Sequence, residues 1–238
     1  MPFRIRGFLI HLLASCILAS IASYVVFMIW YPSPLGQAIG VTSIVLLLLG
    51  VDVVAGPLLT LAVCKEGKKS LKFDLSVIVL LQLCAFVYGF HILAQGRPVW
   101  IAFHENEFHI VRAYEANNEY KEKAKPEYQK LSYTGPQWIA IRTPSAGEKK
   151  SLIDSLNRGV LIVERADFYE PITNQAKLIK EAATDAFTLN QFNDPDHVKK
   201  ILSIWPNADA FLPLSAQETN LTVLIKRNTA EIIAIVAL

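Results

Sequence analysis

The sequence has little cysteine, and what it has lies in one part of the chain. Its three cysteines, Cys16, Cys64 and Cys84, all come before residue 97. Residues 97–238 therefore have no disulfide, and a hydrophobic core must hold them together. Six of the 23 Lys and Arg and three of the 21 Asp and Glu lie before residue 97, which leaves 17 basic and 18 acidic residues after it. This balance gives no sign of nucleic-acid binding.

Sequence patterns typical of enzymes and metal sites are also lacking. No G-x-S-x-G motif, Cys–His pair or glycine-rich phosphate loop occurs. The segment 104–109 holds two His and two Glu, but their spacing is not that of metal ligands. In a continuous strand His104 would point to the side opposite His109. We therefore expect a protein that is not an enzyme and that holds no metal or cofactor.

Charged residues are almost absent from three long apolar runs, which are residues 8–30, 39–63 and 75–94. A helix needs about 20 apolar residues to cross a bilayer. We therefore predict a membrane domain, residues 1–96, with three transmembrane helices. Residues 97–238 have the composition of a separate globular domain.

Basic residues flank these spans unevenly. They lie before the first span and between the second and third, as Arg4, Arg6, Lys65, Lys68, Lys69 and Lys72. Because Lys and Arg concentrate on the cytoplasmic side, we predict a cytoplasmic N-terminus and an exported domain 97–238. The alternative for the first span is a signal peptide cleaved near Ser20–Ala22, but the apolar run continues to Trp30.

Asp52 is the only Asp, Glu, Lys or Arg inside any of the three runs, and it lies near the centre of the second. A charged side chain at that depth costs about 2.5–3.5 kcal/mol on insertion scales, so it normally faces the interior of a bundle. Depth places Gln82 and Ser20 at nearly the same level. Both side chains can hydrogen-bond a carboxyl group.

The pair Gly56–Pro57 predicts a kink one turn after Asp52. Pro57 has no N–H and cannot donate to the carbonyl of Val53, and Gly56 leaves room for a bend or for another backbone. Small residues that favour close packing form two further rows, Ser15, Ala19 and Ala22 on the first span and Gln82, Ala85 and Gly89 on the third. The predicted polar spot either clips the three helices together or meets a transmembrane helix of another protein. Its residues are Asp52, Gly56, Pro57, Gln82, Ser20 and Gly89.

Residues 97–238 predict an α+β domain with a mainly antiparallel sheet. Period-two alternation and turn residues predict hairpins over 100–113 and 222–237, a strand over 137–142, and a short buried strand or extended run over 159–164. Helical patterns cover 145–157, 174–187 and 196–205. The helix 145–157 has Ser145 as its expected cap and Glu148 three residues later.

Several of these motifs together resemble the type IV pilin accessory protein family, often called TfpX/TfpZ. They include the stretch GVDVVAGPLLT, residues 50–60, followed by Gln82-Leu83 in the third span, and Gly135-Pro136 and Leu212-Pro213-Leu214 in the second half. The resemblance implies a protein of the bacterial cell inner membrane with a periplasmic C-terminal domain. It also implies a chaperone or assembly modulator that helps one major pilin reach efficient assembly.

Two other functions compete with this interpretation. A membrane-anchored immunity or sensor protein would bind a ligand with its periplasmic domain, but the chain offers only the loop 65–74 and a short N-terminus for cytoplasmic output. A membrane-embedded hydrolase or transferase would need a second catalytic group near Asp52, where the sequence supplies only Gln, Ser and Thr.

Overall fold

The computed structural model describes residues 2–116 and 119–238, and it divides the chain into two units. The first unit contains the chain up to Gly36 and Gly40–Gln95, and the second contains Gln37–Ile39 and Gly96–Leu238.

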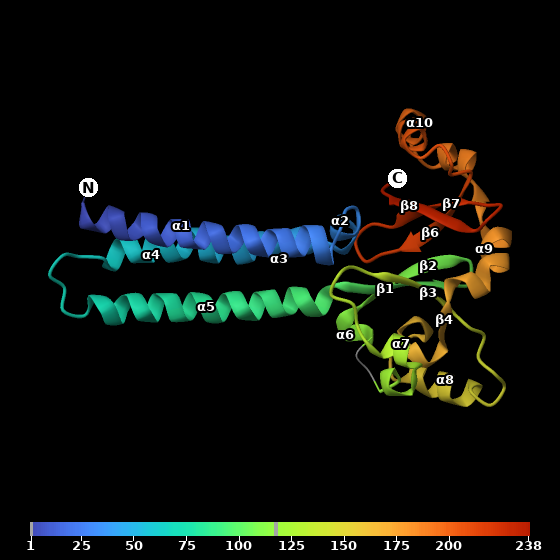
Figure 1. Cartoon of the computed structure of the whole chain (residues 1–238), viewed down its shortest axis with the longest axis horizontal. Coiled ribbons are helices and arrows are strands. Elements are labelled where there is room, and N and C mark those ends of the chain that lie inside the picture. The colour runs from blue at the N-terminus through green and yellow to red at the C-terminus, as the bar shows by residue number, and fades with distance from the viewer. Residues whose placement is uncertain (1, 117–118) are drawn as a thin grey trace. The chain divides into compact units, whose positions relative to one another are not determined.

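The first unit is built from long apolar helices (Figure 1). Helix α1 (Phe3–Tyr24) continues into the π-helical segment η1 (Val25–Trp30), and the short helix α2 (Leu35–Ile39) follows. Helix α3 (Val41–Leu49), the π-helical segment η2 (Gly50–Ala55) and α4 (Gly56–Val63) form one continuous rod, and α5 (Leu71–Gly96) completes the unit. Three helices are long and apolar enough to cross a membrane, namely Phe3–Trp30, Val41–Val63 and Leu71–Gly96.

Helix α1 packs along the α3–η2–α4 rod through small side chains. Its buried residues are Ser15, Ala19 and Ala22, the row that the sequence predicts. The facing row on the rod recurs every fourth residue and consists of Asp52, Gly56, Thr60 and Cys64, all buried. In a regular α-helix such a row drifts by about 40° per step. The wider π-helical turn of η2 takes up part of this drift and keeps the row against α1.

Helix α5 meets its neighbours along one narrow stripe. The Tyr31 hydroxyl donates to the carbonyl oxygen of Leu93 at 2.8 Å. A Cβ atom at Gly89 would lie 2.8 Å from Cδ1 of Leu48, so the two helices approach closely there and a larger residue would require Leu48 to shift. The predicted row Gln82–Ala85–Gly89 is wrong at Ala85, which is exposed. The reason is that the stripe runs through Gln82 and Leu93, to one side of Ala85.

The second unit is an α+β domain whose sheet is mainly antiparallel, as predicted, but also contains parallel pairs and is therefore mixed. Its strands are β1 (Pro98–His104), β2 (Glu107–Arg112), β3 (Gln137–Ile141), β4 (Tyr169–Pro171), β5 (Thr184–Asp185), β6 (Ala210–Ser215), β7 (Leu221–Lys226) and β8 (Glu231–Val236). The strand order is β4-β3-β1-β2-β6-β7-β8, with β5 also paired to β6. The pairs β1–β3 and β2–β6 are parallel, and the other pairs are antiparallel.

The helices of this unit connect the strands. They are α6 (Ala113–Ala116), η3 (Lys121–Lys123), α7 (Pro126–Gln129), α8 (Lys149–Asn157), η4 (Ile162–Glu164), η5 (Ala166–Phe168), η6 (Ile172–Gln175), α9 (Ala176–Ala182), η7 (Ala186–Gln191) and α10 (Pro195–Ile204). Figure 1 shows α10 beside β7 and β8, and α7 and α8 near β4.

The structure confirms both predicted hairpins, as β1–β2 and β7–β8. It contradicts the strand predicted over residues 159–164, where η4 forms instead. The buried side chain there belongs to Val163, which packs into the core without pairing to a strand. The single helix predicted over 174–187 is also wrong. Helix α9 ends at Ala182, and the chain then turns into β5, which pairs with β6.

Within residues 96–116 and 119–238, a larger and a smaller hydrophobic core support the sheet. The larger core centres on Trp100, whose ring packs edge-on against Tyr128 and Tyr169 with centroid distances of 5.9 and 5.7 Å. The Tyr169 hydroxyl donates to the carbonyl oxygen of Val163 at 2.6 Å. The smaller core lies under α10, where Val198 packs with buried residues of β7 and β8.

Candidate functional site

A groove in the first unit has Asp52 in its lining, and we call it the Asp52 groove. Its volume is about 190 Å³. The lining residues come from α1, η2 and α5, and they are His11, Ala14, Ser15, Leu18, Asp52, Val79, Gln82, Leu83 and Phe86. Asp52 is the central residue of the apolar helix Val41–Val63 and is only 3% exposed. The groove thus combines apolar walls with one deeply buried carboxyl group.

The main chain beside Asp52 lacks one of its own hydrogen bonds. In the π-helical segment η2 the N–H of Gly56 donates to the carbonyl of Val51, five residues earlier. The next donor in this register would be residue 57, which is proline and has no N–H. The carbonyl of Asp52 is therefore left without a partner in its own helix.

Gln82 of α5 supplies the missing donor. Its Nε2 donates to the main-chain carbonyl oxygen of Asp52 at 3.2 Å. The sequence correctly nominates Gln82 as a neighbour of Asp52. This hydrogen bond reaches the main chain of Asp52, because the combination of a π-helical turn and Pro57 leaves that carbonyl without a partner in its own helix.

Gly56 makes this contact possible. A Cβ atom at position 56 would overlap the carboxamide of Gln82. Gly56 and Pro57 are both buried and sit at the start of α4. The two residues therefore act together, because Pro57 leaves the carbonyl of Asp52 free and Gly56 gives Gln82 room to reach it.

Two buried acceptors in the Asp52 groove remain unsatisfied. Oδ2 of Asp52 and Oε1 of Gln82 have no hydrogen-bond partner among the described residues. Buried polar atoms are almost always paired, and an unpaired one costs about 1–3 kcal/mol. The lining of the groove can therefore accept two further hydrogen bonds.

Ser20 does not belong to this site. It is exposed, and its hydroxyl donates to the carbonyl oxygen of Cys16 in its own helix at 2.8 Å. The prediction of Ser20 used only its depth along the first span. The face of α1 that meets Asp52 carries Ser15 and Ala19 instead. The predicted residue Gly89 lies elsewhere on α5, against Leu48.

A second polar contact joins α1 to α4, and the sequence does not predict it. Nδ1 of His11 and Oγ1 of Thr60 are 2.6 Å apart. Thr60 is buried and lies one turn after Gly56, on the face that carries Asp52. The four-residue spacing of Asp52, Gly56 and Thr60 could have predicted this contact, because it places all three residues on the same face of the rod.

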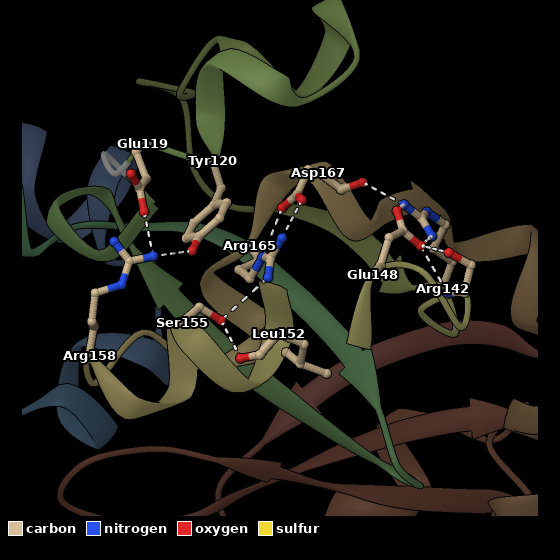
Figure 2. A network of polar contacts seen from close by, with 10 residues as sticks. Glu119, Tyr120, Arg142, Glu148, Leu152, Ser155, Arg158, Arg165 and Asp167 are labelled. Atoms are coloured by element: carbon tan, nitrogen blue, oxygen red, sulfur yellow. Dashed lines mark hydrogen bonds and ion pairs between the residues drawn. The ribbon is translucent and has the colours of Figure 1, made fainter. Parts of the chain in front are cut away.

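The second unit holds a network of charged side chains around Arg165 (Figure 2). The Arg165 guanidinium lies 3.9 Å from the Tyr120 ring centroid and 4.2 Å from that of Phe168. It also pairs with Asp167 at 2.6 Å, although the Arg165 side chain is only 2% exposed. Its contacts tie η3, α8 and η5 together, so the network braces the fold.

A neighbouring network anchors the start of α8. Arg142 pairs with Glu148 at 2.6 Å, and Glu148 accepts from the main-chain N–H of Ser145 at 2.8 Å. These hydrogen bonds hold the pKa of Glu148 well below its usual value. The predicted link between Ser145 and Glu148 is thus present, with α8 beginning one residue after Glu148.

A cavity of about 410 Å³ lies at the β1–β2 turn, between that turn and residues of α8 and α9. Glu105 and Asn106 form the turn with positive φ angles of 47° and 73°. Because the turn reverses the chain, His104 pairs with Glu107 and comes onto the same side as His109. The two rings are 6.5 Å apart, so the prediction that they point to opposite sides is wrong.

Burial lowers the pKa of both His104 and His109. No group of three His, Cys, Asp or Glu able to hold a metal occurs within residues 2–116 and 119–238.

Comparison with known proteins points to one family. Residues 1–40 match the family model described as Fimbrial assembly protein FimB. In Dichelobacter nodosus, the fimbrial assembly protein of serogroup I is 28% identical over 177 residues, which cover 73% of this chain and 69% of that protein. The protein of serogroup E1 is 29% identical over the same extent. The protein of serogroups C1 and C2 is 35% identical over 104 residues, or 43% of this chain and 79% of that protein. No solved structure matches the chain.

Proposed function

Because this chain belongs to the fimbrial assembly protein family and has three helices able to span a bilayer, we propose that it is an inner-membrane accessory protein for a type IV major pilin. In this proposal the first unit lies in the membrane and the second in the periplasm. The basic residues near the N-terminus and in the loop 65–74 support that orientation, since they favour the cytoplasmic side.

The Asp52 groove is the observation that carries the proposal. The family resemblance implies that a pilin subunit waits in the membrane with an apolar N-terminal helix. A groove with apolar walls from α1 and α5 suits such a helix, and close helix packing is what favours association in lipid. The protein would then hold the subunit as a chaperone or modulate its entry into the fibre.

The second unit offers a surface for the pilin head. Phe187, near the start of η7, and Phe192, directly after its end, are each 77% exposed. Exposed apolar side chains that form a contiguous patch commonly mark protein–protein contacts. In the proposed function they contact the part of the pilin that lies outside the membrane.

Photocross-linking in living cells tests the proposal. A photoreactive residue at Leu83, which lines the Asp52 groove, should trap the pilin. Leu81 is the matched control, because it lies on the same helix, is similarly exposed at 65% against 52%, and does not line the groove. Leu18 and Ile17 provide the same comparison on α1. Equal pilin adducts from groove and control positions, or adducts only between copies of this chain, would refute pilin binding in the groove.

A further inference from the structure

The two unpaired acceptors of the Asp52 groove define the chemistry of its occupant. Oδ2 of Asp52 and Oε1 of Gln82 are both buried, and neither has a partner within the described part of the chain. They belong to one groove lining, and each residue lies near the middle of its own apolar helix long enough to span a bilayer, Val41–Val63 and Leu71–Gly96. At that depth no water replaces a missing hydrogen bond, so an unpaired group has an unusually high cost.

Most of the chain's own nearby polar groups are engaged elsewhere, and the hydroxyl of Ser15, which also lines the groove, bonds neither acceptor. His11 is paired with Thr60, and Nε2 of Gln82 is committed to the main-chain carbonyl of Asp52. The Ser20 hydroxyl donates within its own helix. A donor for the two acceptors is therefore best supplied from outside the chain.

We infer that the membrane-spanning helix bound in the Asp52 groove presents a hydrogen-bond donor side chain to Asp52 and Gln82. This inference rests on the proposed function, since it takes the partner helix to be that of the pilin. A hydroxyl, a protonated carboxyl, a carboxamide or an amino group fits the two acceptors. An ionised carboxylate does not fit, because it has no proton to donate and would be repelled by a second carboxylate.

The apolar walls and the polar lining then have different roles. The walls, including Leu18, Leu83 and Phe86, accept any apolar helix of suitable width. The acceptor pair selects among such helices by requiring a donor at one depth, since a helix without one leaves both oxygens unpaired. The groove thereby sets the position of the bound helix along the membrane normal.

The test measures the yield of pilin cross-linking from Leu83 in the full-length protein in its native membrane. Asp52→Leu removes the carboxyl group while keeping an apolar side chain of similar size. We expect it to lower the yield between about 3-fold and about 20-fold, the range for hydrogen bonds between helices in membranes. Asp52→Asn keeps an acceptor oxygen and should stay within about 2-fold of the wild type.

The opposite result is equally well defined. If the groove binds its partner by apolar packing alone, Asp52→Leu leaves the yield unchanged or raises it. The reason is that removal of the carboxyl group lowers the free-energy cost of burying the groove in lipid. That outcome overturns the donor requirement and leaves the proposed function standing. If the wild type gives no pilin adduct from Leu83, or adducts only with a second copy of this chain, the proposed function and the inference both fail.

Two further variants separate binding from folding. Cys64→Ala truncates a buried side chain at the end of the same rod that does not line the groove, and the yield should not change. Gln82→Met keeps the side-chain length but removes the second acceptor, and it should lower the yield even if Asp52→Leu fails to accumulate. Immunoblots of the membrane fraction normalise each yield to the amount of protein. Wild-type yields from both Asp52→Leu and Gln82→Met at normal protein levels would overturn the inference.

Discussion

The contact between Gly56 and Gln82 allows a quantitative prediction by a double-mutant cycle. Gly56→Ala would place a methyl group on the Gln82 carboxamide and so displace it from the carbonyl of Asp52. The lost hydrogen bond costs about 0.6 kcal/mol, and up to about 1.7, in a membrane. Alanine in a helix is favoured over glycine by about 0.5–1 kcal/mol. We therefore expect the net effect of Gly56→Ala in the wild type to lie between a gain of about 0.4 kcal/mol and a loss of about 1.2 kcal/mol.

Gly56→Ala should be more favourable when Gln82 is already absent. In a Gln82→Ala background there is no carboxamide to displace, so Gly56→Ala keeps only its helix-propensity gain. It should then raise the free energy of unfolding by about 0.5–1 kcal/mol. The coupling energy between the two sites is expected to be about 0.6–1.7 kcal/mol. Reversible unfolding in detergent micelles or bicelles would measure all four proteins of the cycle.

Gly50 provides the control. It begins η2, the same π-helical segment, and a Cβ atom there would meet nothing within 4 Å. Gly50→Ala should therefore stabilise the protein equally with and without Gln82. Additivity within about 0.3–0.5 kcal/mol for the Gly56–Gln82 pair would refute the proposed contact.

Three further predictions follow from other parts of the structure. Pro57→Ala restores a main-chain N–H beside Asp52, so the cost of Gln82→Ala in the same micelle assay should shrink; an undiminished cost would contradict the role given to Gln82. Arg165→Met leaves the carboxylate of Asp167 unpaired in a buried site and should destabilise the second unit by about 3–5 kcal/mol in denaturant unfolding followed by Trp fluorescence; a loss below about 1 kcal/mol would argue against the brace. Burial lowers the pKa of His104 below 6.5 in the folded protein, so the unfolded chain binds more protons below pH 6.5 and stability should fall as the pH drops from about 6.5. His104→Gln should flatten that slope, and an unchanged slope would refute its assignment to His104.

The long apolar helices and both hairpins could be predicted from the sequence because their signals are local. Apolar length alone identifies a helix that can span a bilayer, and two short alternating runs around a turn identify a hairpin. The parallel pairs β1–β3 and β2–β6 could not be predicted in this way. Each joins strands that are distant in the chain, and their register depends on packing that no local pattern records.

The candidate site shows the same division. The position of Asp52 within its apolar run predicts its depth and its burial, and depth also selects Gln82. Depth does not specify which face of a helix a residue occupies, so it equally selects Ser20, which the structure places on the exposed side of α1. The hydrogen bond from Gln82 to the main chain depends on the π-helical turn, which sequence spacing does not reveal.

The π-helical turn η2 fits one residue more into the rod than a regular α-helix would need. Deleting a single residue within 50–55 would leave an uninterrupted, equally apolar rod of nearly the same length. Because the wider turn absorbs the extra residue, the helix on either side of the deletion would keep nearly the same orientation, whereas a deletion in a regular α-helix would rotate it by about 100°. Relatives that are one residue shorter here would therefore still present the same faces of the rod to their partners, and only the geometry of the turn itself would change.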